Sequence, residues 1–213
     1  MAGNRRSEVN EMKLLYGTTN QAKLESMRRL TAPLKLEIIG LKDLGLPLPA
    51  VYESGNNPLE NARIKAETYY RAYGMPVFSC DSGLYFEELE EAQQPGVHIR
   101  RVSGKELDDE GMISYYAALA SENGGKLTGR YRNAVYLILD EKTALGSMDE
   151  SLWTEPFILV DKPHEKRVKG YPLDSLSVDI DSGMYYYDMK EKSVDKSAIE
   201  EGYQAFFKKL LSL

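Results

Sequence analysis

An apolar run that passes through a polar turn into an amphipathic helix is the feature that most restricts the fold of this chain. Residues 13–17 read KLLYG, and TTN follows before a segment in which Leu24, Met27 and Leu30 recur at helical spacing. Asn20 suits the N-cap of this helix. The free N–H groups at the start of such a helix point toward the turn and can bind phosphate. The segment therefore predicts a strand–turn–helix unit with a candidate phosphate-binding turn.

Strands and helices are mixed along the rest of the chain, which indicates an α/β or α+β fold. A second helix is expected to start after Asn57, with Pro58 at its first position, Glu60 completing a capping box and Gly74 at its end. Apolar patterns predict further helices at 111–121 and 195–211, and strands at 36–41, 77–80, 84–89, 132–139, 157–160 and 184–187.

Composition and charge restrict the compartment and the partners of the chain. Its 213 residues, 42% of them hydrophobic, are enough for one domain, which we expect over residues 13–213 after a flexible leader at 1–12. A net charge of −6 argues against a nucleic-acid partner. The single cysteine excludes an internal disulfide, and no apolar run is long enough for a membrane span or typical of a secretory signal. We expect a cytoplasmic protein, because a free thiol suits a reducing compartment.

The first cluster of polar residues lies at the first strand–helix junction and comprises Thr18, Thr19, Asn20 and Lys23. One interpretation is structural, with a capped helix and a solvated lysine. The other is a phosphate cradle, in which hydroxyl, amide and ammonium groups converge with backbone N–H groups. The junction alone leaves both interpretations open.

Two further polar clusters contain carboxylates. Glu53 precedes the second expected helix, which carries Lys65, and Asp81, Ser82 and Gly83 follow the apolar run at 77–80. Taken alone, the trio after this run favours a turn, because Asp, Ser and Gly favour turns. Taken together, two carboxylates and two lysines are a suitable set for a magnesium–polyphosphate site, since Mg²⁺ prefers oxygen ligands and shares its shell with phosphates.

Three stretches together resemble the family of inosine triphosphate pyrophosphatases, which remove nonstandard purine nucleotides such as ITP, dITP and XTP. They are TTNQAK (18–23), ESGNNPLENARIKA (53–66) and CDSGLYFEELEEAQQPGVHIRRVSG (80–104), in the order and spacing of the family. The resemblance implies an α/β fold with two lobes on a long bent mixed sheet flanked by helices, with the active cleft between the lobes. It also implies a homodimeric enzyme, a nucleoside triphosphate diphosphatase that uses Mg²⁺ to convert NTP and water to NMP and diphosphate.

The resemblance assigns roles to residues by their positions. Glu53 and Asp81 would bind the metal, and Asp81 would also act as base for the attacking water. Lys23 would complete this catalytic set. The metal would make the α-phosphorus more electrophilic and lower the pKa of bound water. The residues that would contact the substrate are Thr18, Thr19, Asn20, Lys23, Lys65, Ser82, Gly83, Lys169 and Lys196.

Three parts of the sequence depart from the family pattern. Cys80 stands in place of the first acid of the family's D-D-S-G-L stretch, and a thiol is a poor Mg²⁺ ligand. The family's glycine-aromatic loop, G-F-G-Y-D-P, has its nearest expected counterpart in KGYPLDSLS (169–177). Glu200, Glu201 and Gly202 stand in place of the family's Ser, His and Arg, of which the His and Arg read the purine.

The departures leave alternatives open. Ionised glutamates accept hydrogen bonds and cannot donate them. Glu200 and Glu201 therefore either suit a base with an amino group or are first-turn acids favoured by the helix dipole. Two other functions remain alongside the nonstandard purine pyrophosphatase: a nucleotide-binding module without catalysis, and a pyrophosphatase for a different class of base.

Overall fold

The structure, a computed structural model, describes residues 12–102, 104–189 and 197–211. The expected leader lies outside these residues, apart from Met12, which begins the first strand. The helices are α1 (Gln21–Thr31), α2 (Pro58–Tyr73), α3 (Asp109–Glu122) and α4 (Ser197–Leu211). The strands are β1 (Met12–Tyr16), β2 (Leu36–Gly40), β3 (Val77–Phe86), β4 (Arg101–Val102), β5 (Lys105–Glu106), β6 (Lys126–Asp140), β7 (Thr143–Ser147), β8 (Phe157–Val160) and β9 (Ser177–Val178).

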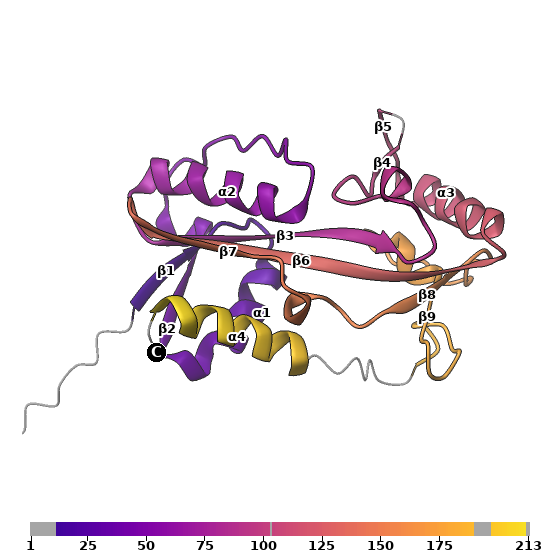
Figure 1. Cartoon of the computed structure of the whole chain (residues 1–213). Helices are drawn as coiled ribbons and strands as arrows, with labels where there is room; N and C mark the ends of the chain where they lie inside the picture. The colour runs from indigo at the N-terminus through magenta and orange to yellow at the C-terminus, as the bar shows by residue number, and fades with distance from the viewer. Residues whose placement is uncertain (1–11, 103, 190–196, 212–213) are drawn as a thin grey trace, which may run out of the picture.

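One mixed sheet organises the described part of the chain. Its strand order is β2-β1-β3-β6-β8-β9, with β7 paired to β6, and β4 and β5 form a separate hairpin. β1 runs parallel to β2 and β3, whereas β3 runs antiparallel to β6 along its whole length. The long pair β3–β6 extends from the side that carries α2 to the side that carries α3 (Figure 1). This mixed sheet flanked by helices confirms the predicted α/β class.

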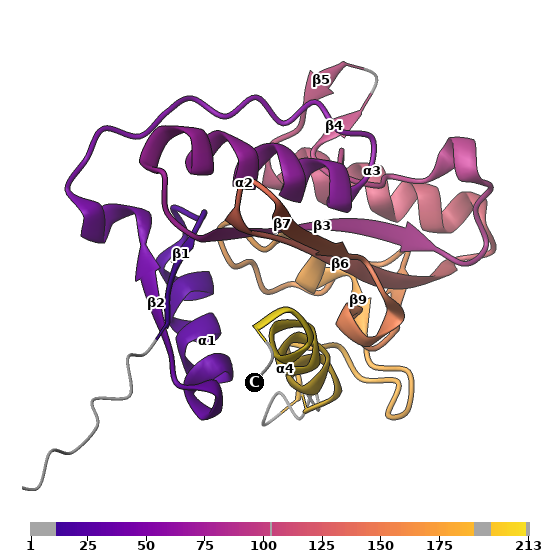
Figure 2. The same ribbon diagram turned by 60° about the vertical axis from the view of Figure 1, so that its left-hand side comes forward.

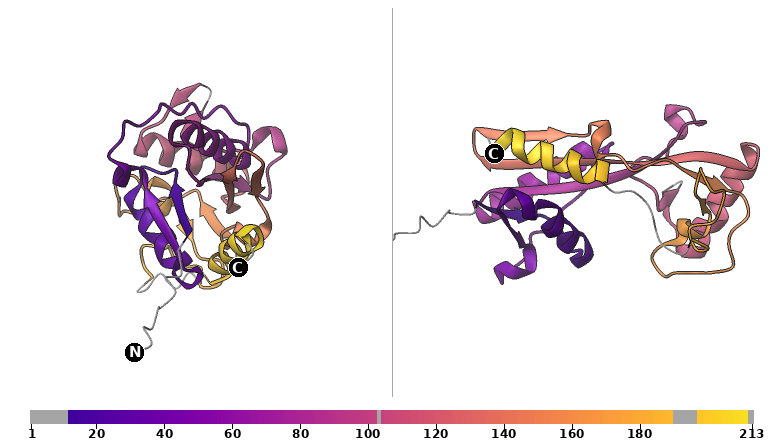
Figure 3. Two further views of the ribbon diagram at one scale, coloured as in Figure 1. Left: turned by 90° about the vertical axis from the view of Figure 1, so that its left-hand side faces the viewer. Right: turned by 90° about the horizontal axis from the view of Figure 1, so that it is seen from below.

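Helices cover both faces of the sheet. α2 lies on one face, and α1 and α4 lie on the other (Figures 2 and 3). On the face of α1 and α4, the ring of Phe78 stacks on that of Tyr16 at 4.5 Å between centroids and meets the ring of Phe207 edge-on at 5.1 Å. None of the helices in the described ranges combines the length and the apolar character that crossing a membrane requires.

The helix boundaries follow the capping residues of the sequence. Asn20 Oδ1 accepts a hydrogen bond from Lys23 N at the start of α1, and Asn57 Oδ1 accepts one from Glu60 N at the start of α2. Gly74 ends α2 with a φ of 62°, a conformation that glycine adopts without strain. The capping box differs from the expected one, because the Glu60 carboxylate accepts from Asn56 N at 2.7 Å, one residue before the cap.

The turn predicted at Asp81-Ser82-Gly83 is wrong, because these residues lie inside β3. β3 is continuous from Val77 to Phe86, and every one of its residues has a partner on β6. Pairing along this length outweighs the local preference of the trio for a turn, since strand preference depends strongly on neighbouring strands. The separate strands expected at 77–80 and 84–89 are therefore one strand.

Other boundaries differ in ways that have the same cause. The strand expected at 132–139 is the middle of the longer β6, and β7, which pairs with it, was not expected. The strand expected at 184–187 is absent, since only one bridge, between Val178 and Tyr185, forms in that segment. Pairing between strands, rather than the local pattern alone, decides these differences.

Replacing Gly202 tests how closely α4 approaches the turn that contains Ser151. A Cβ at Gly202 would lie 2.2 Å from the backbone oxygen of Ser151. Alanine inside a helix is normally more stabilising than glycine. Here we expect the opposite: Gly202→Ala should lower the free energy of unfolding by about 1–3 kcal/mol through overpacking. Urea denaturation measures the change. Glu201→Ala, an exposed neighbour on α4, serves as control, and a stabilising effect of Gly202→Ala would contradict the close approach.

Candidate active site

Lys65, in the middle of α2, holds two carboxylates from separate segments. Its Nζ lies 2.7 Å from Asp81 Oδ1 on β3 and 3.5 Å from Glu53 Oε1 in the loop before α2. The side chains of Lys65 and Asp81 are only 13% and 15% exposed, whereas that of Glu53 is 45% exposed. The two acids therefore lie no farther apart than the sum of these two distances, within reach of one cation.

Hydrogen bonds to α2 fix the loop that carries Glu53. Gly55 N donates to the buried Asn61 Oδ1 at 2.8 Å, and Asn56 N donates to Glu60. A Cβ at Gly55 would lie 2.7 Å from Asn61 Oδ1, so the loop approaches the helix as closely as only glycine allows. The irregular segment that carries Glu53 is thus positioned by α2, the same helix that carries Lys65.

The edge of β3 that faces β1 is open in its middle. β1 pairs with β3 as far as Phe78, and Gly96 resumes pairing on that side at Leu84, whose N–H and C=O both bond to it. Backbone groups of a strand alternate between its two edges. The N–H and C=O groups of Cys80 and Ser82 therefore face the open edge between these two contacts.

The start of α1 lies at the end of β1. Asn20 caps the helix through its side chain, and Thr18 Oγ1 accepts from Asn20 N at 3.2 Å, so the structural interpretation of this junction is confirmed. The first turn of α1 contains no acid, so the positive end of its dipole is not offset there. Thr19 and Lys23 are both exposed. Phosphate binding at this junction stays a prediction.

A pocket of about 250 Å³ lies between α1, α4 and the middle of β3. We call it the α1–α4 pocket. Lys23 and apolar side chains of α1 form one wall, Cys80 and Ser82 form the floor, and Glu200 and Tyr203 of α4 form the opposite wall. Lys23 thus lies in the same pocket as the sheet residues beside Asp81.

Cys80 is partly buried at the floor of the pocket, and its thiol behaves as a neutral group. Burial raises the pKa of its thiol to about 11, although a hydrogen bond with Tyr16 and the charges of Lys23 and Lys65 lower the pKa. The opposing effect of the two lysines shows that both ammonium groups lie near this point of β3. A neutral thiol is a weak ligand, so Cys80 does not replace the missing acid in holding a hard metal ion.

Ser82 is the first member of a chain of hydrogen bonds beneath the pocket. Its Oγ lies 2.7 Å from Asn133 Oδ1 on β6, and Asn133 Nδ2 donates to Leu152 O at 2.7 Å. Gly83 is buried, and a Cβ there would lie 2.9 Å from the Tyr85 ring. Close packing alone explains the glycine, and substrate contact by Ser82 and Gly83 stays a prediction.

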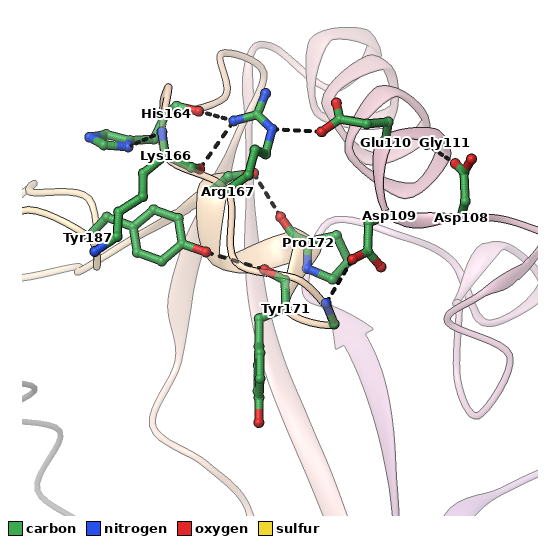
Figure 4. Close-up of polar contacts among 12 residues, drawn as sticks. Asp108, Asp109, Glu110, Gly111, His164, Lys166, Arg167, Tyr171, Pro172 and Tyr187 are labelled. Atoms are coloured by element: carbon green, nitrogen blue, oxygen red, sulfur yellow. Dashed lines mark hydrogen bonds and ion pairs between the residues drawn. The ribbon is translucent and has the colours of Figure 1, made fainter.

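Lys169, one of the lysines proposed for the substrate, is not part of this group. Hydrogen bonds from Gly170 N and Arg100 lower the pKa of Asp109 most, and the charge of Lys169 lowers it further. Figure 4 shows this segment beside the start of α3, where Arg167 also pairs with Glu110. The structure thus places Lys169 next to Asp109, whereas Lys196 lies outside the described residues.

A second hollow, of about 160 Å³, includes Glu53 in its lining, together with His98, Arg100 and Arg101. Arg100 Nη2 forms an ion pair with Asp109 Oδ1 at 2.8 Å. Basic side chains thus lie in the same hollow as Glu53.

The segment 152–156 was missed in the sequence. It reads LWTEP, with an aromatic residue, an acid and a proline in the order of the glycine-aromatic loop expected at 169–177. Thr154 lines the α1–α4 pocket, and the guanidinium of Arg132 lies between the rings of Trp153 and Tyr85, at 4.7 and 4.2 Å. The pocket is thus closed by 152–156, whereas 169–177 lies beside α3.

The model of the Ham1 family matches residues 14–156, which include β1, α1, the Glu53 loop, α2 and β3. The chain belongs to the Ham1 family. This membership confirms the resemblance drawn from the three sequence stretches.

Relatives in this family carry one name. The chain is 43% identical over 109 residues to a dITP/XTP pyrophosphatase of Anaeromyxobacter dehalogenans, an alignment that covers 51% of this chain and 45% of the relative. It is 30% identical over 142 residues to one of Methylococcus capsulatus, covering 66% and 69%. The chain spans about half the length of several of the curated relatives that it matches.

Solved structures share the fold over nearly the whole chain. A HAM1 protein from Coxiella burnetii superposes with a TM-score of 0.73 at 20% identity, covering 93% of this chain and 99% of that one. A dITP/XTP pyrophosphatase from Mycobacterium abscessus gives a TM-score of 0.65 at 22% identity, with 93% and 99% covered. The Ham1 fold thus extends beyond the residues that the family model matches.

Removing the charge of Lys65 tests whether it holds the two acids together. Lys65→Met leaves Asp81 without its cation in a place with little access to water, and we expect a loss of about 1–3 kcal/mol in the free energy of unfolding at pH 7. Urea denaturation measures it. Arg71→Met is the matched control, because Arg71 pairs with Glu67 on the same helix but is 76% exposed. Equal losses in the two variants would contradict a special role for Lys65.

The raised pKa of Cys80 predicts a dependence of stability on pH. The folded protein holds the thiol proton more tightly than the unfolded chain does, so this stabilisation is complete below pH 9 and is lost as the pH rises toward 11. In Cys80→Ser, we expect the fall in unfolding free energy over that interval to be smaller by about 1–3 kcal/mol. Denaturation at pH 7 and at pH 10.5–11 gives the comparison, and parallel slopes would refute it.

Proposed function

We propose that this chain is a nucleoside triphosphate pyrophosphatase that converts NTP and water to NMP and diphosphate. The observation that carries the proposal is the convergence of Glu53, Asp81 and Lys65, with Lys23 and the start of α1 at the open edge of the same strand. Acids and cations in this arrangement suit a triphosphate with its counter-ion. The names of the relatives point to nonstandard purine triphosphates such as dITP and XTP as the first substrates to assay.

The carboxylates fit a divalent ion. Their oxygens already surround one cation, the Lys65 ammonium, from two sides. In the described residues, no group of three or more His, Cys, Asp or Glu side chains could form a closed metal site. Two carboxylates suffice for Mg²⁺, which completes its shell with water and substrate phosphates. Glu53 and Asp81 would hold the Mg²⁺ ion, which would supply positive charge at the phosphate oxygens and acidify bound water.

The chain's own residues would position the phosphates and accept the proton. Lys23 and the backbone N–H groups at the start of α1 would bind phosphate oxygens, and Lys65 would add positive charge. Asp81 would take a proton from the attacking water, whose oxygen bonds to the α-phosphorus while the bond to diphosphate breaks. Most of the rate would come from positioning and charge stabilisation, as is general for phosphoryl transfer.

One observation favours a second function, a nucleotide-binding module without turnover. Cys80, which is neutral, stands at the position of the family's first acid. If that acid were needed for chemistry, the pocket and the lysines would still bind nucleotide. The same assay separates the two functions, because a module would be stabilised by nucleotides and release no diphosphate.

Asp81→Asn is the sharpest test of the proposed reaction. The variant keeps the size of the side chain but removes the base and a metal ligand, so we expect diphosphate release from dITP and XTP to fall by about 100-fold or more. EDTA should abolish the wild-type activity. Glu67→Gln, an exposed carboxylate on α2, is the control, and circular dichroism checks that the variants are folded.

Two outcomes would contradict the proposal. Full activity of Asp81→Asn would remove Asp81 from the reaction. A rise in melting temperature with nucleotides, but no diphosphate from any triphosphate, would show the binding module instead.

The assembly and the compartment stay predictions. The resemblance implies a homodimer, and light scattering of the purified chain would give its mass. A cytoplasmic location is expected from the single free cysteine and from the nucleotide substrate.

A further inference from the structure

The α1–α4 pocket has the size and walls of a site for a planar ring. An apolar cavity of about 150 Å³ accepts benzene, and this pocket, at about 250 Å³, holds a larger ring system. Met27 and Leu30 of α1 and Ile199 of α4 supply apolar walls. Lys23 lies in the same pocket, so a nucleotide whose phosphates meet Lys23 at the open edge of β3 can place its base here.

Several polar side chains of the pocket already form hydrogen bonds with other groups of the protein. Ser82 and Asn133 bond to each other, and Asn133 bonds onward to Leu152. Thr154 Oγ1 accepts from the backbone N–H of Tyr131. These groups therefore shape the pocket, and they offer little to a base that enters it.

Among the polar side chains of the pocket, those of Lys23, Ser26 and Glu200 have no hydrogen bond or ion pair with any other described residue. Glu200, the only acid of these three, lies in the first turn of α4 and is exposed. An ionised carboxylate accepts hydrogen bonds and cannot donate them. A ring bound beside it gains a hydrogen bond if it presents an amino group, and meets repulsion between lone pairs if it presents a keto oxygen.

We propose that Glu200 makes this pocket select nucleotides whose base presents an amino group, over those with a keto group at the same position. The inference rests on the proposed function and names the substrate class of that site. It also marks a difference from the keto purines in the names of the relatives. The family match ends at residue 156, so it does not reach α4, and the base preference of relatives is not carried by the residues that were matched.

The test compares nucleotides that differ only in this exchange. ATP and ITP form one pair, and CTP and UTP form another. For wild type, we expect kcat/KM to favour the amino member of at least one pair by about tenfold or more, the usual range for one well-placed hydrogen bond to a base. Glu200→Gln, which can donate as well as accept, should bring that ratio close to one. Glu201→Gln, the exposed neighbour that does not line the pocket, should leave the ratio unchanged.

A binding measurement keeps this inference separate from the proposed reaction. Calorimetry of AMP and IMP in EDTA reports base recognition without turnover. One outcome is that no triphosphate is hydrolysed, AMP binds about tenfold more tightly than IMP, and Glu200→Gln removes the difference. This outcome would contradict the proposed reaction and support the inference about the base. If triphosphates are hydrolysed with a preference for the keto members, or with a ratio that Glu200→Gln does not change, the inference is overturned. Absence of binding by both monophosphates, with no turnover, also overturns it.

Discussion

The ammonium of Lys65 is the interaction on which the arrangement of this site depends. Asp81 lies on a strand and Glu53 in an irregular loop, and no element of secondary structure joins them. Lys65 contacts both, and the hydrogen bonds from Gly55 and Asn56 hold the loop to the same helix. Two carboxylates this close would repel each other without a cation between or beside them. The helix therefore keeps the two acids together, as the proposed metal site requires.

The local parts of this structure could be predicted from the sequence, and the long-range parts could not. Asn20, Asn57 and Gly74 mark helix ends correctly because capping depends on a few neighbouring residues. Asp81, by contrast, was placed in a turn, because the partner that keeps it in a strand is Ala134, more than fifty residues later. The acids and lysines of the site could be named from their motifs, but the segment 152–156 was missed, because LWTEP keeps only the aromatic residue, the acid and the proline of the family's loop and lacks its glycines.

Alternation along β3 divides the site between the two faces of the sheet. Asp81 points to the face of α2, where it meets Lys65, whereas Cys80 and Ser82 point to the face of α1 and α4. Residues adjacent in sequence thus serve different parts of the site. β1 ends before this part of β3, so the edge of β3 is open there. In the proposed site, a triphosphate chain that crosses this edge would meet Lys23 on one face and the acids on the other.

This division allows chemistry and base recognition to change separately. The acids, Lys65 and Lys23 all lie within residues 14–156, the part that the Ham1 model matches, and α4 lies outside it. α4 is held by apolar packing and by the close approach of Gly202 to Ser151, neither of which involves Glu200. A substitution at Glu200 would therefore change the hydrogen bonds available in the pocket without removing the contacts that hold α4. Because the residues proposed for the reaction lie within the matched part of the chain and Glu200 does not, family membership bears on the proposed reaction more strongly than on the base.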